Sequence, residues 1–146
     1  MRHLVVVLFV FVALCCQASA QTSSPMSMPS GWALANATGV KAIEDGAEPG
    51  GGPKRGFTLS ASVTLAQPCY DLKIIQIPST VDHPKPGVLT YAIVQHRNAT
   101  ICNEMVTVKP VSQRFQVTPP LPPSVNVRSL KYALPKPAQV VPITAS

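Results

Sequence analysis

Aromatic and charged residues are scarce in this sequence, and their scarcity limits the partners that it can bind. The 146 residues include one Trp, three Tyr and four Phe, and 12% of the chain is charged, with a net charge of +6. Nucleic-acid binding uses a clustered basic surface with stacking aromatic side chains, whereas no basic run here is longer than Lys54-Arg55. We therefore predict no nucleic-acid partner, and a core that consists mainly of Val, Ile and Leu.

Catalytic motifs are missing as well. The sequence contains no G-x-S-x-G nucleophile turn, no H-E-x-x-H zinc helix and no G-x-x-x-x-G-K-[ST] phosphate loop. A Ser-His-Asp set can be assembled from Ser79, His83 and Asp71, but a catalytic triad is defined by geometry and not by residue type. We therefore predict a protein that is not an enzyme and that carries no cofactor and no metal. The alternative from another class is a secreted hydrolase that uses His83 or His96.

The start of the chain has the three parts of a secretory signal peptide. Arg2 and His3 form a short positive end, residues 4–14 are an apolar run, and residues 18–20 are small, as a signal peptidase requires. A membrane anchor needs about 20 apolar residues, and the polar Gln17 interrupts this run. The sequence therefore predicts secretion, or export to the periplasm in a Gram-negative source, without stable insertion into a membrane after cleavage.

Removal of the signal peptide leaves two cysteines, Cys69 and Cys102. In an oxidising compartment such a pair is most simply a disulfide, and its spacing does not match the C-x-x-C motif of redox and metal sites. Closing a loop of a little over thirty residues stabilises a fold by about 3–4 kcal/mol in the chain-entropy model. The disulfide is therefore predicted to be important in a small domain with few aromatic core residues.

Composition divides the chain into a signal peptide at residues 1–20, a leader at residues 21–56 and a folded domain at residues 57–146. The leader is predicted to be disordered or loosely ordered, because it is rich in small residues and ends in a Gly/Pro linker. The dibasic pair Lys54-Arg55 in this linker is a candidate processing site. The last part of the domain is rich in proline.

Period-two alternation is the clearest structural signal. Over residues 57–65 apolar and small polar side chains alternate strictly, which is typical of a strand with one buried face. Other strands are expected at residues 70–77, 88–96, 101–108, 111–117, 124–128 and 130–134. Short strands with frequent turns favour an all-β fold, and we predict a small antiparallel β-sandwich, Ig-like in architecture. Its core is predicted to contain Phe57, Leu59, Val63, Leu65, Leu72, Ile74, Val94 and Val106.

The function expected for such a chain is that of a non-enzymatic extracellular binding or structural module. Its partner would be an extracellular protein or a surface polymer. Asn36 and Asn98 begin N-x-[ST] sequons and are candidate glycosylation sites if the source is eukaryotic. The alternative within the non-enzymatic class is a protease inhibitor that presents the proline-rich loop of residues 78–87, from Pro78 to Gly87.

Overall fold

The computed structural model describes residues 28–46, 56–78, 88–134 and 136–146. The predicted signal peptide and the Lys54-Arg55 pair lie outside these ranges. Within them, no helix is long and apolar enough to cross a membrane. Over the same ranges the regular structure is nearly all β, with one short 3-10 helix. Its elements are β1 (Trp32–Leu34), β2 (Ala37–Glu44), β3 (Gly56–Leu65), β4 (Tyr70–Ile77), β5 (Thr90–Arg97), β6 (Thr107–Gln116), β7 (Ser124–Arg128), η2 (Leu130–Tyr132) and β8 (Gln139–Thr144).

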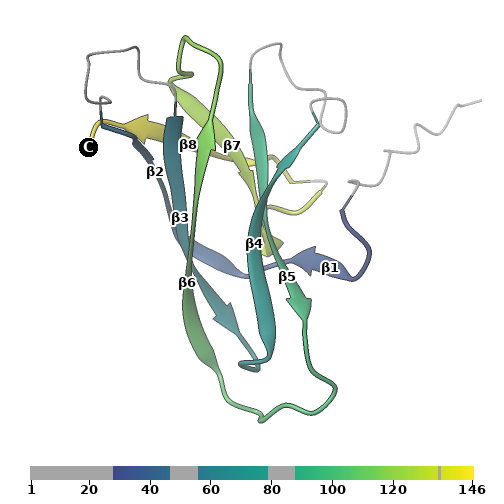
Figure 1. Ribbon diagram of the computed structural model, residues 1–146. Coiled ribbons are helices and arrows are strands. Elements are labelled where there is room, and N and C mark those ends of the chain that lie inside the picture. Colours follow the sequence, from purple (N-terminus) through teal and green to yellow (C-terminus); the bar gives the residue numbers. More distant parts are fainter. Residues whose placement is uncertain (1–27, 47–55, 79–87, 135) are drawn as a thin grey trace, which may run out of the picture.

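The eight strands form one curled sheet (Figure 1). Its order is β1-β5-β7-β8-β2-β3-β6, and β4 pairs with β5. One half of the sheet contains β1, β4, β5 and β7, and the other half contains β2, β3 and β6. Strand β8 joins the two halves, because its first residues pair with β7, whereas Ile143 and Thr144 pair with β2. The main core cluster contains side chains from β3, β4, β5 and β7 and lies inside the curl of the sheet.

Two of the strand pairings are parallel. β2 runs parallel to β8, and β5 runs parallel to β7. The sequence predicts an antiparallel sheet, and this prediction is confirmed for the other pairings and is wrong for these two. Parallel neighbours need long crossover connections, and here such connections are provided by whole intervening strands. Hydrophobic alternation shows which face of a strand is buried, but it carries no information on the direction of the neighbouring strand.

Strand β3 confirms the alternation seen in the sequence. Phe57, Leu59, Val63 and Leu65 are buried in the core. Ile74 and Val94 are also buried as predicted, and Leu72 is partly buried against the same core. Strand β5 is buried on both faces, because Val94 belongs to a second cluster with Ala92 and Ile77.

The sheet begins before the predicted domain boundary at residue 57. The structure places β1 and β2 in the sheet, whereas the sequence assigned residues 21–56 to a leader. The buried side chains here are small, namely Ala35, Ala37 and Ala42. In addition, the register of β2 against β3 shifts between Thr38 and Lys41, around Gly39, which has a φ of 61°. Both features remove the alternation that would have predicted a strand.

Three other elements differ from their predictions. Residues 101–106 form an irregular connection, and β6 begins at Thr107 and continues through Pro110. Proline is tolerated there because β6 pairs with β3 alone and is an edge strand. The strand predicted at residues 130–134 is the 3-10 helix η2. Val106, predicted to lie in the core, is 73% exposed, so that prediction is wrong.

Candidate interaction site at the disulfide-linked end

Four segments of the chain lie close together. They are the junction between β1 and β2, the turn between β3 and β4, the connection between β5 and β6, and η2. The turn and the connection lie at the lower end of the sheet in Figure 1. Residues from all four segments line one hollow of about 360 Å³, and they are Asn36, Thr64, Ala66, Tyr70, Gln95, Val106 and Leu130. We call this part of the molecule the disulfide end.

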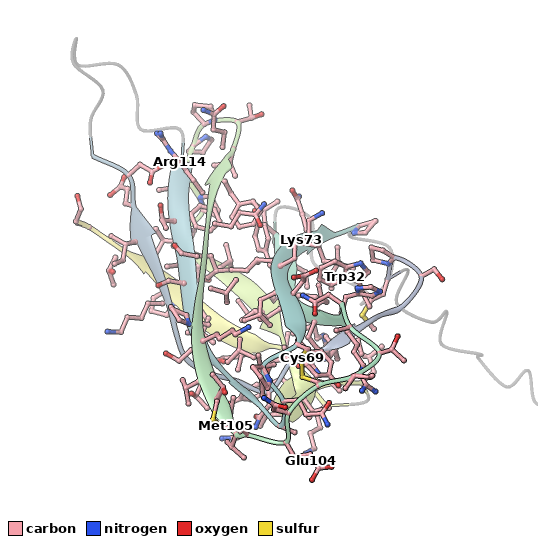
Figure 2. The ribbon with its side chains drawn as sticks, turned by 60° about the horizontal axis from the view of Figure 1, so that its bottom comes forward. Trp32, Cys69, Lys73, Glu104, Met105 and Arg114 are labelled. Carbon is pink, nitrogen blue, oxygen red and sulfur yellow. A yellow bond between two sulfur atoms is a disulfide. The ribbon has the colours of Figure 1, made fainter. Side chains whose placement is uncertain are left out.

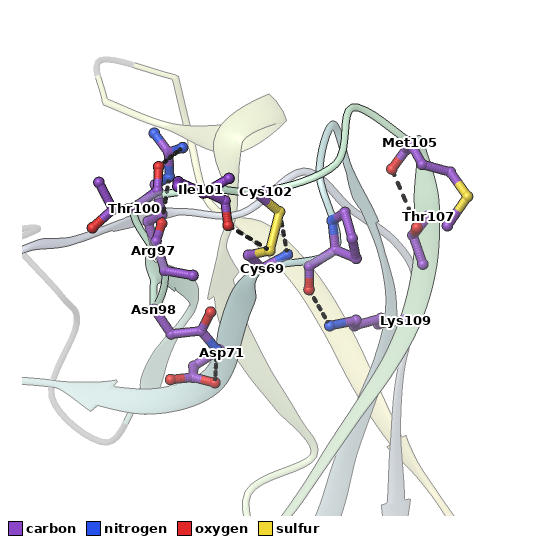
Figure 3. The surroundings of a disulfide bond; sticks show 12 residues. Cys69, Asp71, Arg97, Asn98, Thr100, Ile101, Cys102, Met105, Thr107 and Lys109 are labelled. Atoms are coloured by element: carbon purple, nitrogen blue, oxygen red, sulfur yellow. Dashed lines mark hydrogen bonds between the residues drawn. A yellow bond between two sulfur atoms is a disulfide. The ribbon is translucent and has the colours of Figure 1, made fainter.

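A disulfide between Cys69 and Cys102 holds this end together, as the sequence predicted (Figure 3). The backbone N–H of Cys69 donates to Cys102 Sγ at 3.2 Å. The carbonyl oxygen of Cys69 accepts a hydrogen bond from the backbone N–H of Asn98 at 3.1 Å. The turn between β3 and β4 is therefore tied to the connection between β5 and β6 both covalently and through the backbone.

Further hydrogen bonds fix the irregular connection between β5 and β6. The guanidinium of Arg97 donates to the carbonyl oxygens of Ala99 and Thr100, at 3.0 and 3.1 Å. The ammonium of Lys109 donates to the carbonyl of Pro68 at 2.5 Å, and so links the start of β6 to the turn before Cys69. These contacts hold the connection in one shape although it has no ladder of its own.

The disulfide end also carries most of the exposed apolar side chains. In the described part of the chain, eight large hydrophobic side chains are exposed, and five of them lie here. Figure 2 shows Met105 and Glu104 at this end of the molecule, with Arg114 at the opposite end. We call the five residues the apolar patch: Ile101 (91% exposed), Met105 (60%), Val106 (73%), Val108 (62%) and Leu130 (59%).

Charges around the patch are mixed. Arg97 and Lys131 are exposed basic residues, and Glu104 is an exposed acidic residue. The side chains that line the hollow itself are all uncharged. The geometry therefore fits a neutral or apolar contact better than the recognition of an ion.

The other predicted site residues have different surroundings. Asn36 and Asn98 are both exposed, and Asn98 Nδ2 donates to Asp71 Oδ1 at 2.8 Å. His96 is partly buried, and its ring lies 5.3 Å from that of Trp32. His83 and residues 79–87 lie outside the described ranges, so the hydrolase and inhibitor alternatives stay predictions. No group of three or more potential metal ligands occurs among the residues that the structure describes.

The apolar patch was not predicted from the sequence. The run of Ile101, Cys102, Met105 and Val106 was interpreted as a strand because apolar residues usually indicate burial. One signal could have distinguished a buried strand from an exposed connection. It is Asn103-Glu104, a polar pair that interrupts the apolar residues in the middle of this run.

The chain was compared with protein-family models, with curated proteins and with solved structures, and nothing matched it. The case for a function therefore rests on the geometry of the disulfide end.

Proposed function

We propose that this protein is a secreted, non-enzymatic binding module, and that the apolar patch at its disulfide end contacts an extracellular protein. The observation that carries the proposal is a set of five exposed apolar side chains around the disulfide-linked connection. Three of them lie in the connection itself, Val108 lies at the start of β6, and Leu130 lies in η2, which a backbone hydrogen bond holds to Ala35. Exposed apolar groups that gather in one place are typical of interaction surfaces. A fixed segment loses little conformational freedom on binding, which favours affinity.

The size of the patch indicates how strong the contact is. Complete burial of all five side chains would contribute about 8–15 kcal/mol, and association itself costs about 4–15 kcal/mol. The patch alone therefore supports a weak, reversible contact. The exposed Arg97, Glu104 and Lys131 around it would supply the polar contacts that give specificity.

A scaffold of this kind suits a β-sandwich of Ig-like architecture, which we propose for the two halves of the curled sheet. Support comes from the core between the halves, where Phe57 of β3 and Tyr91 of β5 meet edge to face at 5.7 Å. Sandwich domains commonly present binding segments at the ends of their strands. The disulfide end is such a position.

Export can be tested by the intact mass of the protein recovered from the medium. We expect a mass that begins at Gln21, with two thiols that become reactive only after reduction. A protein that retains Met1, or that has two free thiols before reduction, would contradict export and would return the chain to a reducing compartment.

The contact surface can be tested with a photoreactive amino acid placed at Ile101, at Met105 or at Val140. Val140 is the matched control, because it is also exposed (65%) but lies on β8, away from the patch. After irradiation in extracellular fluid from the source, we expect the same discrete cross-linked protein from positions 101 and 105 and none from position 140. Equal cross-linking from all three positions, or none from any, would overturn the proposal.

A further inference from the structure

Asn36 occupies an unusual place at the disulfide end. It begins the sequon Asn36-Ala37-Thr38 and lies at the junction between β1 and β2. Its backbone carbonyl accepts a hydrogen bond from the N–H of Thr64 at 3.0 Å, so the position of its backbone is fixed. Its side chain is exposed and lines the hollow, and its amide nitrogen donates no hydrogen bond to the residues that the structure describes.

Two members of the apolar patch line the same hollow as Asn36. They are Val106 and Leu130, which are 73% and 59% exposed. The N–H of Leu130 donates to the carbonyl of Ala35 at 2.9 Å, so η2 is held against the residue that precedes Asn36. A group attached to the Asn36 amide would therefore emerge beside two uncovered aliphatic side chains.

We propose that Asn36 carries an N-linked glycan whose first N-acetylglucosamine packs over Val106 and Leu130. This inference rests on the export that is part of the proposed function. A bond forms between Asn36 Nδ2 and C1 of the sugar. The donor is a polyprenyl-diphosphate oligosaccharide, whose diphosphate departs with the bonding electrons as the amide nitrogen loses a proton. The ring C–H groups and the acetyl methyl of this sugar are apolar and match the aliphatic side chains.

The hollow also suits the polar side of such a sugar. Its lining includes the side chains of Thr64, Gln95 and Tyr70, which can donate and accept hydrogen bonds and carry no formal charge. Sites for neutral ligands combine an apolar lining with a few polar groups in this way. The lining of the hollow therefore matches both faces of a sugar attached to Asn36, and such a sugar would cover one side of the patch.

Asn98 provides a matched comparison within the same molecule. Its side-chain amide already donates a hydrogen bond to Asp71, and the hollow beside it is lined by Arg97, Ala99 and Thr100. None of these three is a large exposed hydrophobic residue. A glycan at Asn98 would therefore cover little apolar surface, whereas one at Asn36 covers Val106 and Leu130.

The full-length chain, secreted from eukaryotic cells, tests the inference through mass spectrometry and binding of an apolar fluorescent dye. Thr38→Ala removes the Asn36 sequon and leaves Asn36 in place, and Thr100→Ala does the same for Asn98. We expect a glycan at Asn36. We also expect Thr38→Ala to raise dye fluorescence about twofold or more, since exposed apolar patches bind such probes, and Thr100→Ala to leave it unchanged.

A triple variant completes the test. Replacing Val106 and Leu130 with Ser in the Thr38→Ala background is expected to return the fluorescence to the level of the glycosylated protein. An unmodified Asn36, or a Thr38→Ala protein with unchanged dye binding, would overturn the inference. If the native signal peptide does not direct export, the same variants are secreted with a different signal peptide. Failure of export and failure of the glycan contact can then be distinguished.

The cross-linking experiment also distinguishes the two proposals. Ile101, Met105 and Val108 do not line the hollow, so the glycan leaves them uncovered. A glycan that covers Val106 and Leu130 without any partner at positions 101 and 105 would refute the proposed contact surface and leave this inference standing.

Discussion

Tyr91 is the largest fully buried side chain of the core. Its ring packs against those of Phe115 and Phe57, with centroids 4.4 and 5.7 Å away. Its hydroxyl has no hydrogen-bond partner in the structure described. A buried polar group without a partner destabilises a fold by about 1–3 kcal/mol, so the aromatic packing of this residue outweighs the cost of its hydroxyl.

Burial raises the pKa of Tyr91 to about 12, from 10.0, because the phenolate loses its hydration. The unfolded chain therefore releases this proton at lower pH than the folded chain, and stability that is present below pH 10 falls as the pH rises from about 10 to about 12. The slope is at most about 1.4 kcal/mol per pH unit.

We expect Tyr91→Phe to raise the free energy of unfolding by about 1 kcal/mol near pH 8 and to remove this alkaline loss. Denaturant unfolding of both proteins at pH 8 and pH 11 provides the measurement. The other tyrosines are shared, so the difference between the two proteins isolates Tyr91. An equal alkaline loss in both would show that Tyr91 does not control it.

Position 56 requires glycine, because the surrounding atoms leave no space for a side chain. A Cβ atom there would lie 2.5 Å from Asp45 Oδ2 and 2.7 Å from the carbonyl oxygen of Phe115. Asp45 cannot move freely, because Arg114 Nε donates to it at 2.6 Å and Thr58 Oγ1 at 3.1 Å. These contacts join the end of β2 to β6 across β3.

We therefore expect Gly56→Ala to lower the free energy of unfolding by about 1–3 kcal/mol, the usual cost of overpacking. Gly46→Ala is the matched control, because nothing lies within 4 Å of a Cβ at that position. The midpoint of thermal unfolding should be clearly lower for Gly56→Ala than for Gly46→Ala. Equal midpoints would mean that the backbone near Phe115 can move to make room for the Cβ atom without loss of stability.

At the scale of elements, β2 is indispensable although the sequence placed it outside the domain. It lies between β3 and β8, and pairs with both. Without β2, β3 would lose one of its two neighbours and β8 would lose its pairing with that half of the sheet.

A chain that begins at Gly56 should therefore fail to fold, whereas one that begins at Met28 retains every described strand. Far-UV circular dichroism during heating makes the comparison, and only the longer chain should show a cooperative transition. A cooperative transition in the shorter chain would show that β3 to β8 form an independent domain.

Strands with strict alternation, or with several β-branched or large apolar residues bounded by turns, were predictable, and those with neither signal were not. The pattern over residues 57–65 identified β3, because large apolar and polar side chains alternate there. β1, β2 and β8 lack this contrast. In β8 the exposed Val140 and the proline at position 142 conceal the buried Val141. Local sequence describes the faces of a strand, whereas these strands are held by neighbours that are distant in the sequence.

The candidate site was predictable only in its covalent part. Spacing and compartment predicted the Cys69–Cys102 bond, since a lone pair of cysteines in an exported chain has few other uses. The apolar patch was not predicted, because four of its five residues lie in a run, residues 101–108, that resembles a buried strand, and Leu130 lies beside Val106 only in the fold. Asn36 was identified as a sequon, but its place beside Leu130 depends on the hydrogen bond between Leu130 and Ala35.

At the scale of the whole molecule, the disulfide is a large part of the stability. It closes a loop with a sequence separation of 33 residues, which is worth about 3–4 kcal/mol in the chain-entropy model. Domains of ordinary size are stable by only about 5–15 kcal/mol. The double replacement Cys69→Ala/Cys102→Ala should therefore lower the free energy of unfolding by about 3–4 kcal/mol, as measured by urea unfolding. An unchanged unfolding midpoint would contradict this account.

The position of β8, which follows all other described strands in chain order, has a consequence for biosynthesis. Its residue Ile143 pairs with Ala42 of β2, so the first and last long segments of the sheet must find each other. The sheet therefore cannot close until residues 139–144 have been synthesised. Both bridging cysteines are synthesised well before β8. The cross-link can thus form in a nascent chain that is still open, and a chain that stalls before residue 139 would be oxidised but incomplete.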